Sequence, residues 1–246
     1  PLVVALDDSV SATLLPYFVK LLQDPEAEVR ASASKNIAGY CELVGTEAFV
    51  EDVSPTLAEL AGDLAQSVRV AVAESIMAVL PQLEYEAAVT HLLPLVMQFL
   101  RDETPEVRLK VLTALDKLVN SVGSSIVSSS IVPALLALGS DSQWRVRETV
   151  VKCMPLLAHS LGAAAFEEKL LPLHFQSMRD QVFSVRATAT ASLKGIGNTL
   201  GLEWCTAKLL PAILDMFESA TSYLQRNTAL YAIMHLMGAK GMGVLV

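Results

Sequence analysis

The feature that most constrains the fold is a set of residues that recurs every 39 positions along the chain. The proline column is Pro16, Pro55, Pro94, Pro133, Pro172 and Pro211. The aspartate column is Asp24, Asp63, Asp102, Asp141 and Asp180, and the arginines that end a Val-Arg pair are Arg30, Arg69, Arg108, Arg147 and Arg186. A period of about 40 residues is typical of stacked helical repeats, in which each unit buries its apolar face against its neighbours. We therefore predict an all-α solenoid of about six repeats.

The period divides the chain into repeats that form one continuous solenoid over 1–246. Their approximate bounds are 10–45, 46–84, 85–123, 124–162, 163–201 and 202–246. Each repeat is expected to hold a first helix kinked by its proline, a tight turn and a second helix. A glycine is expected to end the second helix in the left-handed conformation, at Gly45, Gly123, Gly162 and Gly201.

The second helices carry one apolar stripe each. In the third repeat the stripe is Val107, Val111, Leu115 and Leu118, and the second and fourth repeats match it. A short helix with a single apolar stripe is not stable alone, so neighbouring repeats must cover it.

The aspartate and arginine columns predict a second set of contacts. Asp24 and Arg30 are six residues apart, which is too far for good pairing within one helix. Stacking instead places the arginine of one repeat near the aspartate of the next. We therefore predict an Arg–Asp ladder of charge-assisted bonds that also holds the turn backbone. The competing interpretation is a set of solvated surface charges.

Composition narrows the possible partners. The net charge of −8 and the pI near 5.0 argue against nucleic acid, whose phosphates require clustered lysine and arginine. No uninterrupted apolar run reaches the roughly 18 residues of a membrane span. Cys41, Cys153 and Cys205 are widely spaced, so we expect buried free thiols in a reducing compartment. The chain begins without an initiator methionine and ends where a further repeat is expected, which indicates a fragment of a longer solenoid.

No arrangement of residues predicts an enzyme. The four histidines stand apart from other metal ligands, and no nucleotide-binding or hydrolase fingerprint occurs. Acid pairs such as Glu167 and Glu168 lie in turns or at helix starts, where solvated charge explains them better than catalysis does. A solenoid also lacks the deep pocket that catalysis usually needs. We expect no cofactor, no metal and no small-molecule substrate.

The turns are the surface that remains for recognition. Three residues after the aspartate column the early repeats carry Ala27, Gln66 and Pro105, whereas the later ones carry Trp144 and Phe183, with Tyr223 close by. Aromatic residues with arginines beside them, here Arg145 and Arg226, are the usual anchors of protein interfaces. The alternative is that each ring folds back over its own helix ends. Tyr223 and Arg226 come one residue later than the period requires, which leaves the last turn undecided.

These columns resemble the HEAT repeat, and some segments resemble the scaffold (A) subunit family of protein phosphatase 2A more closely. The segments that carry this resemblance include Trp144-Arg145-Val146-Arg147 and Met154-Pro155-Leu156-Leu157-Ala158. The resemblance implies a heterotrimer in the cytoplasm and also the nucleus. It places the catalytic subunit at Trp144, Arg145, Phe183, Tyr223 and Arg226. Glu26, Glu28, Gln66 and Glu106 would meet a regulatory subunit, or would simply be solvated turn residues.

Two other classes remain open. A nuclear transport receptor would bind cargo through an acidic concave face without aromatic turn anchors. A HEAT-like enzyme such as a bilin lyase would need clustered polar residues in a concave groove, and the sequence offers no such cluster.

Overall fold

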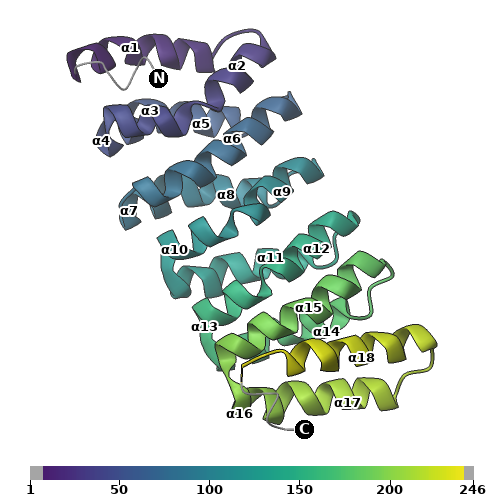
Figure 1. Cartoon of the computed structure of the whole chain (residues 1–246). Coiled ribbons are helices and arrows are strands. Elements are labelled where there is room, and N and C mark those ends of the chain that lie inside the picture. The colour runs from purple at the N-terminus through teal and green to yellow at the C-terminus, as the bar shows by residue number, and fades with distance from the viewer. Residues whose placement is uncertain (1–7, 241–246) are drawn as a thin grey trace. The chain divides into compact units, whose positions relative to one another are not determined.

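The computed structural model describes residues 8–240, with side chains described from residue 14 onward. These residues form helices joined by short turns, without any strand among them, which confirms the predicted all-α class (Figure 1). They fall into two compact units, one up to Gly123 and one from Ser124 onward. The expectations about the two chain ends concern residues 1–7 and 241–246, which lie outside the described range.

The helices alternate with turns in both units. The first unit holds α1 (Asp8–Leu22), α2 (Ala27–Ser34), α3 (Ile37–Val44), α4 (Thr46–Ala48), α5 (Ser54–Leu60), α6 (Gln66–Val79), α7 (Tyr85–Ala87), α8 (Leu93–Phe99), α9 (Pro105–Thr113) and the start of α10 (Leu115–Ile126). The second unit holds α11 (Val132–Leu138), α12 (Trp144–Lys152), α13 (Met154–Lys169), α14 (Leu171–Ser177), α15 (Phe183–Leu200), α16 (Leu202–Trp204), α17 (Leu210–Glu218) and α18 (Tyr223–Met237).

The prolines of the first helices are accommodated by widened turns. In four repeats a five-residue π-helical segment comes just before the short α-helix that contains the proline. These segments are Phe49–Val53, Ala88–Leu92, Val127–Ile131 and Cys205–Leu209. Proline has no N–H to donate and its ring clashes with the carbonyl four residues back, so a wider turn removes both problems. The expected single kinked helix over about 47–61 is thus three consecutive segments, α4, Phe49–Val53 and α5.

The second helices are continuous in only some repeats. α6, α15 and α18 run without interruption, but α2 and α3, α9 and α10, and α12 and α13 are separated by breaks of one or two residues. α12 and α13 meet at an angle of 53° at Cys153, just before Pro155. The apolar stripe survives these breaks, because each stripe residue of the second, third and fourth repeats is buried. The prediction of the stripe is therefore confirmed, and the prediction of one unbroken second helix is wrong for these three.

The glycines that end the second helices have positive φ, as expected, but their backbone is not left-handed helical. Gly45, Gly123, Gly162 and Gly201 have φ between 73° and 87°, and their ψ values lie between 165° and 172°. This region of backbone space is open essentially to glycine alone. The chain consequently leaves one helix and enters the next in a single residue.

The Gly45 conformation gives a direct test. Gly45→Ala should lower the free energy of unfolding by about 2 kcal/mol, because alanine is strained at this φ and ψ. Nothing lies within 4 Å of the added Cβ, so crowding does not contribute. Gly39 lies inside α3, with equally open space around it. Gly39→Ala should raise the free energy of unfolding by about 0.5–1 kcal/mol. Chemical denaturation followed by circular dichroism measures both changes. Equal effects at the two sites would show that the Gly45 backbone does not require glycine.

Within residues 8–240 one helical stretch, Leu115–Leu138, is long and apolar enough to cross a membrane by length and composition alone. It is interrupted at Gly123, whose backbone is not helical, and it carries Asp116 and Lys117. Its residues Leu115, Leu118 and Val122 are buried. Core helices pass the same test of length and composition, so the stretch is weak evidence for a span.

The three cysteines are buried, as predicted. Burial raises the pKa of the Cys41 thiol to about 11, and burial also raises the pKa of Cys205. Within residues 8–240 no group of three or more His, Cys, Asp or Glu side chains is placed to hold a metal ion.

Candidate protein-binding surface

The Arg–Asp ladder links successive repeats inside each unit. Arg30 binds Asp63 through two parallel bonds, Nε to Oδ2 at 2.7 Å and Nη2 to Oδ1 at 3.0 Å. Arg69 binds Asp102 in the same way at 2.8 and 3.1 Å, and Arg147 binds Asp180 at 2.7 and 2.9 Å. Each pair joins the arginine of one repeat to the aspartate 33 residues later, in the next repeat, as the period predicts.

The ladder also shapes the turns. The remaining guanidinium nitrogen, Nη1, donates to the carbonyl of the aspartate six residues back, for example from Arg69 to Asp63 at 2.8 Å. Each aspartate accepts the backbone N–H two residues on, as Asp102 does from Thr104 at 2.8 Å. Burial alone would raise the pKa of Asp102, but the bonds from Arg69 and the Thr104 N–H hold it below the usual value. One ion pair therefore fixes two turns at once.

These turns place one equivalent residue at the start of every second helix. That residue is the first of α2, α6, α9, α12, α15 and α18, in the order Ala27, Gln66, Pro105, Trp144, Phe183 and Tyr223. The period alone therefore locates a surface position whose side chain is free to vary.

In the second unit this position is aromatic in three neighbouring helices. α15 packs against α12 on one side and α18 on the other, and the three helices start at the same edge of the unit (Figure 1). Phe183 is 69% exposed and Tyr223 66% exposed, so both side chains are largely open to solvent. Trp144 is half-buried, and the Arg145 guanidinium lies 4.6 Å from its ring centroid. We call Trp144, Arg145, Phe183 and Tyr223 the aromatic edge.

The last turn settles the one-residue shift seen in the sequence. α17 continues to Glu218, so Ser219 caps a helix instead of holding the turn as an aspartate would. The turn is held by a capping box in which Gln225 Oε1 accepts the N–H of Thr221 at 2.8 Å and the N–H of Ser222 at 3.3 Å. Tyr223 thereby becomes the first residue of α18, equivalent to Trp144 and Phe183.

The same alignment assigns Arg226 to the ladder column. It lies three residues into α18, as Arg147 lies in α12 and Arg186 in α15, and it is therefore the last arginine of the ladder column. It was expected beside the aromatic edge as a companion of Arg145. The residue equivalent to Arg145 is Leu224, which is 46% exposed. Sequence spacing missed Leu224 because the insertion shifts it by one position.

A polar cluster around Glu148 holds the aromatic edge in place, and sequence analysis did not find it. Glu148 of α12 accepts from Ser184 at 2.7 Å and from Thr188 at 3.1 Å, both on α15, and binds Lys152 at 3.0 Å. Burial opposes the ionised form, yet these three donors lower the pKa of Glu148. Because the partners are not repeated along the chain, no periodic signal pointed to them.

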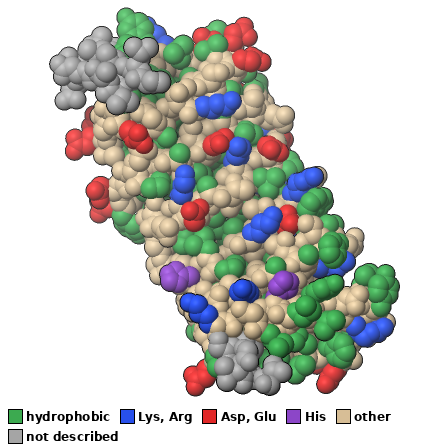
Figure 2. Space-filling model, in the orientation of Figure 1, with side chains coloured by type: hydrophobic (Ala, Val, Ile, Leu, Met, Phe, Trp, Pro, Cys, Tyr) green, Lys and Arg blue, Asp and Glu red, His purple; other side chains and the backbone are tan. Residues whose placement is uncertain are grey.

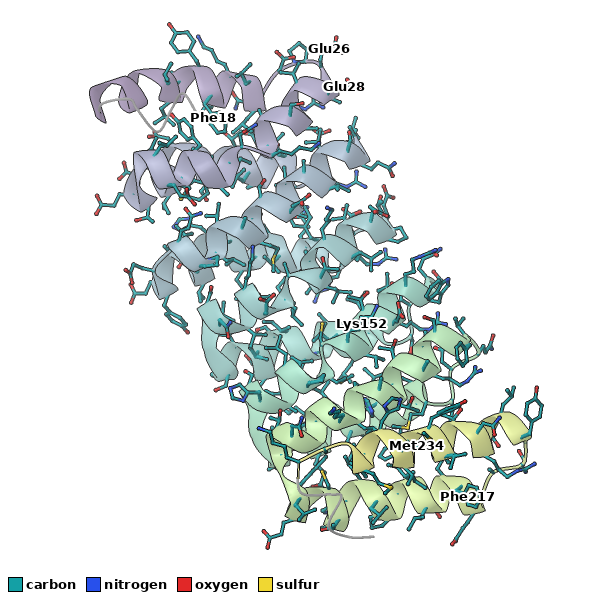
Figure 3. All side chains as sticks on the ribbon, in the orientation of Figure 1. Phe18, Glu26, Glu28, Lys152, Phe217 and Met234 are labelled. Atoms are coloured by element: carbon teal, nitrogen blue, oxygen red, sulfur yellow. The ribbon has the colours of Figure 1, made fainter. Side chains whose placement is uncertain are left out.

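The residues expected to meet a regulatory subunit all lie in the first unit. Glu26, Glu28, Gln66 and Glu106 are exposed at the starts of α2, α6 and α9. Figure 3 shows Glu26 and Glu28 side by side at the start of α2, pointing away from the helices. We call Glu26, Glu28, Gln66 and Glu106 the acidic turn edge, in contrast to the aromatic edge of the second unit.

Comparisons with known proteins agree on the architecture. A family model described as PPP2R1A-like HEAT repeat matches residues 7–83, and one described as PIK3R4-like, middle domain, matches residues 82–224. No curated relative matches the chain's sequence.

Solved structures show the same fold at low sequence identity. Cex1p has a TM-score of 0.69 at 15% identity over 96% of this chain and 46% of its own. A mutant of Kap121p has a TM-score of 0.66 at 15% identity over 94% of this chain and 24% of its own. A designed armadillo repeat protein has a TM-score of 0.57 at 17% identity over 90% of this chain and 99% of its own.

These neighbours confirm the predicted α-solenoid fold, and the two family models agree with it. The PIK3R4-like model covers more than half of the 246 residues. The chain is therefore a HEAT-repeat protein that belongs, over more than half of its length, to the PIK3R4-like middle-domain family.

Proposed function

We propose that this chain is a non-catalytic scaffold that joins a serine/threonine phosphatase catalytic subunit to a regulatory subunit, as in protein phosphatase 2A. The observation that carries the proposal is the aromatic edge, with two largely exposed rings at the starts of adjacent helices. The PPP2R1A-like match over residues 7–83 and the sequence resemblance to the phosphatase scaffold support the same assignment.

The chemistry of the aromatic edge suits a partner protein. Aromatic rings with an adjacent arginine bury a large area at low conformational cost and dominate the binding energy of many interfaces. Helices packed side by side lie roughly 10 Å apart, so the three aromatic positions present anchors at regular steps. A protein surface with matching apolar pockets would meet several of them together.

Scaffolding would act by geometry. The catalytic subunit would bind the aromatic edge of the second unit, and the regulatory subunit would bind the acidic turn edge of the first unit. Holding both on one chain raises their effective concentration without any new contact between them. The heterotrimer would lie in the cytoplasm and also the nucleus.

A binding experiment with purified phosphatase catalytic subunit tests the proposal. Trp144→Ala and Phe183→Ala should each weaken binding about tenfold or more, because each removes a central aromatic anchor. The control is Leu64→Ala, which removes a fully exposed apolar side chain from a turn of the first unit and should leave the affinity unchanged. Isothermal titration calorimetry measures the affinities. Wild-type affinity in the Trp144→Ala, Phe183→Ala double variant would contradict the proposal.

The alternative, an adaptor such as a nuclear transport receptor, predicts the opposite pattern. Capture of a basic cargo peptide would survive loss of Trp144 and Phe183. It would be lost when acidic residues are replaced by lysine, for example at Glu26 and Glu28. The two sets of variants therefore separate the classes with the same binding assay.

A further inference from the structure

The ladder column contains an arginine whose acidic partner is missing. Arg186 keeps the bonds to its own turn, because Nη1 donates to the Asp180 carbonyl at 2.7 Å and to the Gln181 carbonyl at 3.0 Å. The residue 33 positions on is Ser219 instead of aspartate. Within the described residues, no carboxylate pairs with Nε and Nη2, the two nitrogens that bind Asp63, Asp102 and Asp180 elsewhere in the ladder.

The guanidinium is nevertheless held in the orientation that the ladder uses. The two carbonyl bonds restrain Nη1, and the guanidinium carbon lies 5.9 Å from the Phe183 ring centroid. Nε and Nη2 of Arg186 are open to solvent. A fork that is already oriented loses little entropy when it binds a carboxylate through two parallel bonds.

This fork opens into a groove between α15 and α18. The groove has a volume of about 400 Å³ and is lined by apolar, hydroxyl and amide side chains together with Arg186 and His235, without an Asp or Glu among its described lining residues. Phe183, Leu224 and Tyr231 are between 46% and 69% exposed and form its apolar wall. Figure 2 shows hydrophobic side chains gathered over this corner of the second unit.

We propose that the groove binds an extended segment of a partner protein that carries an aspartate or glutamate next to a large apolar residue. The carboxylate would occupy the Arg186 fork as Asp180 occupies that of Arg147. The apolar residue would pack against Phe183, Leu224 and Tyr231. The charge of the fork, the lack of acidic lining and the exposed apolar wall together select this chemistry over a basic or purely apolar segment.

The inference goes beyond the phosphatase assignment. The groove shares Phe183 with the aromatic edge, but its preference follows from Arg186 whatever protein supplies the segment. Loss of phosphatase binding and loss of acidic-peptide binding are measured separately, so either result can fail alone.

The test uses the whole chain and two fluorescein-labelled nonapeptides. One has a central Leu-Asp-Phe sequence flanked by glycine and serine, and the other has Leu-Asn-Phe in its place. Fluorescence anisotropy should show the Asp peptide binding at least tenfold more tightly than the Asn peptide. Arg186→Gln should remove this difference. Arg186→Lys keeps the charge but not the fork, and should retain only a small part of it.

Arg179→Gln provides the matched control, because Arg179 is an exposed arginine of the second unit that does not line the groove. It should leave both peptides unaffected, while circular dichroism checks that every variant is folded. An NMR titration gives a second readout, in which the Arg186 Nε–H signal should shift on adding the Asp peptide. Equal affinity for the two peptides, no measurable binding of either at millimolar concentration, or full preference in Arg186→Gln would overturn the inference. Tighter binding of a phosphoserine version would overturn the choice of a carboxylate.

Discussion

Asp102→Ala is expected to lower the free energy of unfolding by about 3 kcal/mol, because it strands a buried guanidinium. The side chains of Arg69 and Asp102 are only 8% and 7% exposed, so Arg69 would lose its main partner in a place that water barely reaches. Arg69 keeps an ion pair with Glu103 at 3.3 Å and bonds to the Thr104 hydroxyl at 2.9 Å and the Asp63 carbonyl at 2.8 Å, which places the expected loss at the lower end for broken buried pairs. Urea denaturation followed by circular dichroism measures the loss.

Asp116→Ala is the matched control, since Asp116 is an exposed aspartate on α10 of the same unit. It should change the free energy of unfolding by less than about 0.5 kcal/mol. A loss at Asp102 no larger than this would show that the ladder does not stabilise the stack.

The ladder also sets the response to strong acid. Hydrogen bonds from the arginines lower the pKa of Asp63, Asp102 and Asp180 in the folded chain, although burial opposes the shift. A depressed carboxyl pKa contributes stability that is present above the unfolded pKa and is lost as the pH falls through the folded value. This contribution therefore begins to fall below about pH 4 and is lost progressively as the pH drops further.

His174 is expected to make the second unit lose up to about 3 kcal/mol of stability between pH 7 and pH 4. Its side chain is fully buried in α14, and burial lowers its pKa to about 4 from the ordinary 6.5. The unfolded chain therefore binds a proton between pH 6.5 and 4 that the folded chain does not, and this favours unfolding as the pH falls. The stability is fully present above pH 6.5, which separates this effect from that of the ladder.

The comparison that isolates His174 is the pH dependence of unfolding in a variant that cannot titrate. His174→Leu should show a much flatter curve between pH 6.5 and 4 than the wild type, whatever its stability at neutral pH. His159→Leu changes an exposed histidine of the same unit and should follow the wild-type curve. An unchanged slope in His174→Leu would show that the buried ring is not responsible.

Much of the fold could be predicted from the sequence because every repeat needs the same kinds of side chain at the same positions. The buried stripe, the Arg–Asp pairing and the column that begins each second helix all follow from spacing. The breaks inside these helices could not be predicted. They fall in one column of the period, at Asn36, Ala114 and Cys153, yet the equivalent Ser75 and Ser192 lie inside the unbroken helices α6 and α15, so spacing alone does not tell which second helices break.

The candidate binding surface was likewise predicted only in part. The positions of Trp144 and Phe183 were correct from spacing, and the exposure of Phe183 and Tyr223 came from the structure. A longer α17 and a capping box at Ser222 absorb the one-residue insertion and place Arg226 in the ladder column, while its contact with a catalytic subunit stays a prediction.

The sequence by itself determined the repeating unit, its apolar stripe and its ion pairs, because contacts between neighbours separated by a constant interval leave a periodic record in the chain. Only the tertiary structure decided which polar groups meet across helices without such a record. The Glu148 cluster belongs to this second kind, since it depends on Ser184 and Thr188 of one neighbouring repeat, and the groove beside Arg186 does too, since it depends on how α18 packs against α15.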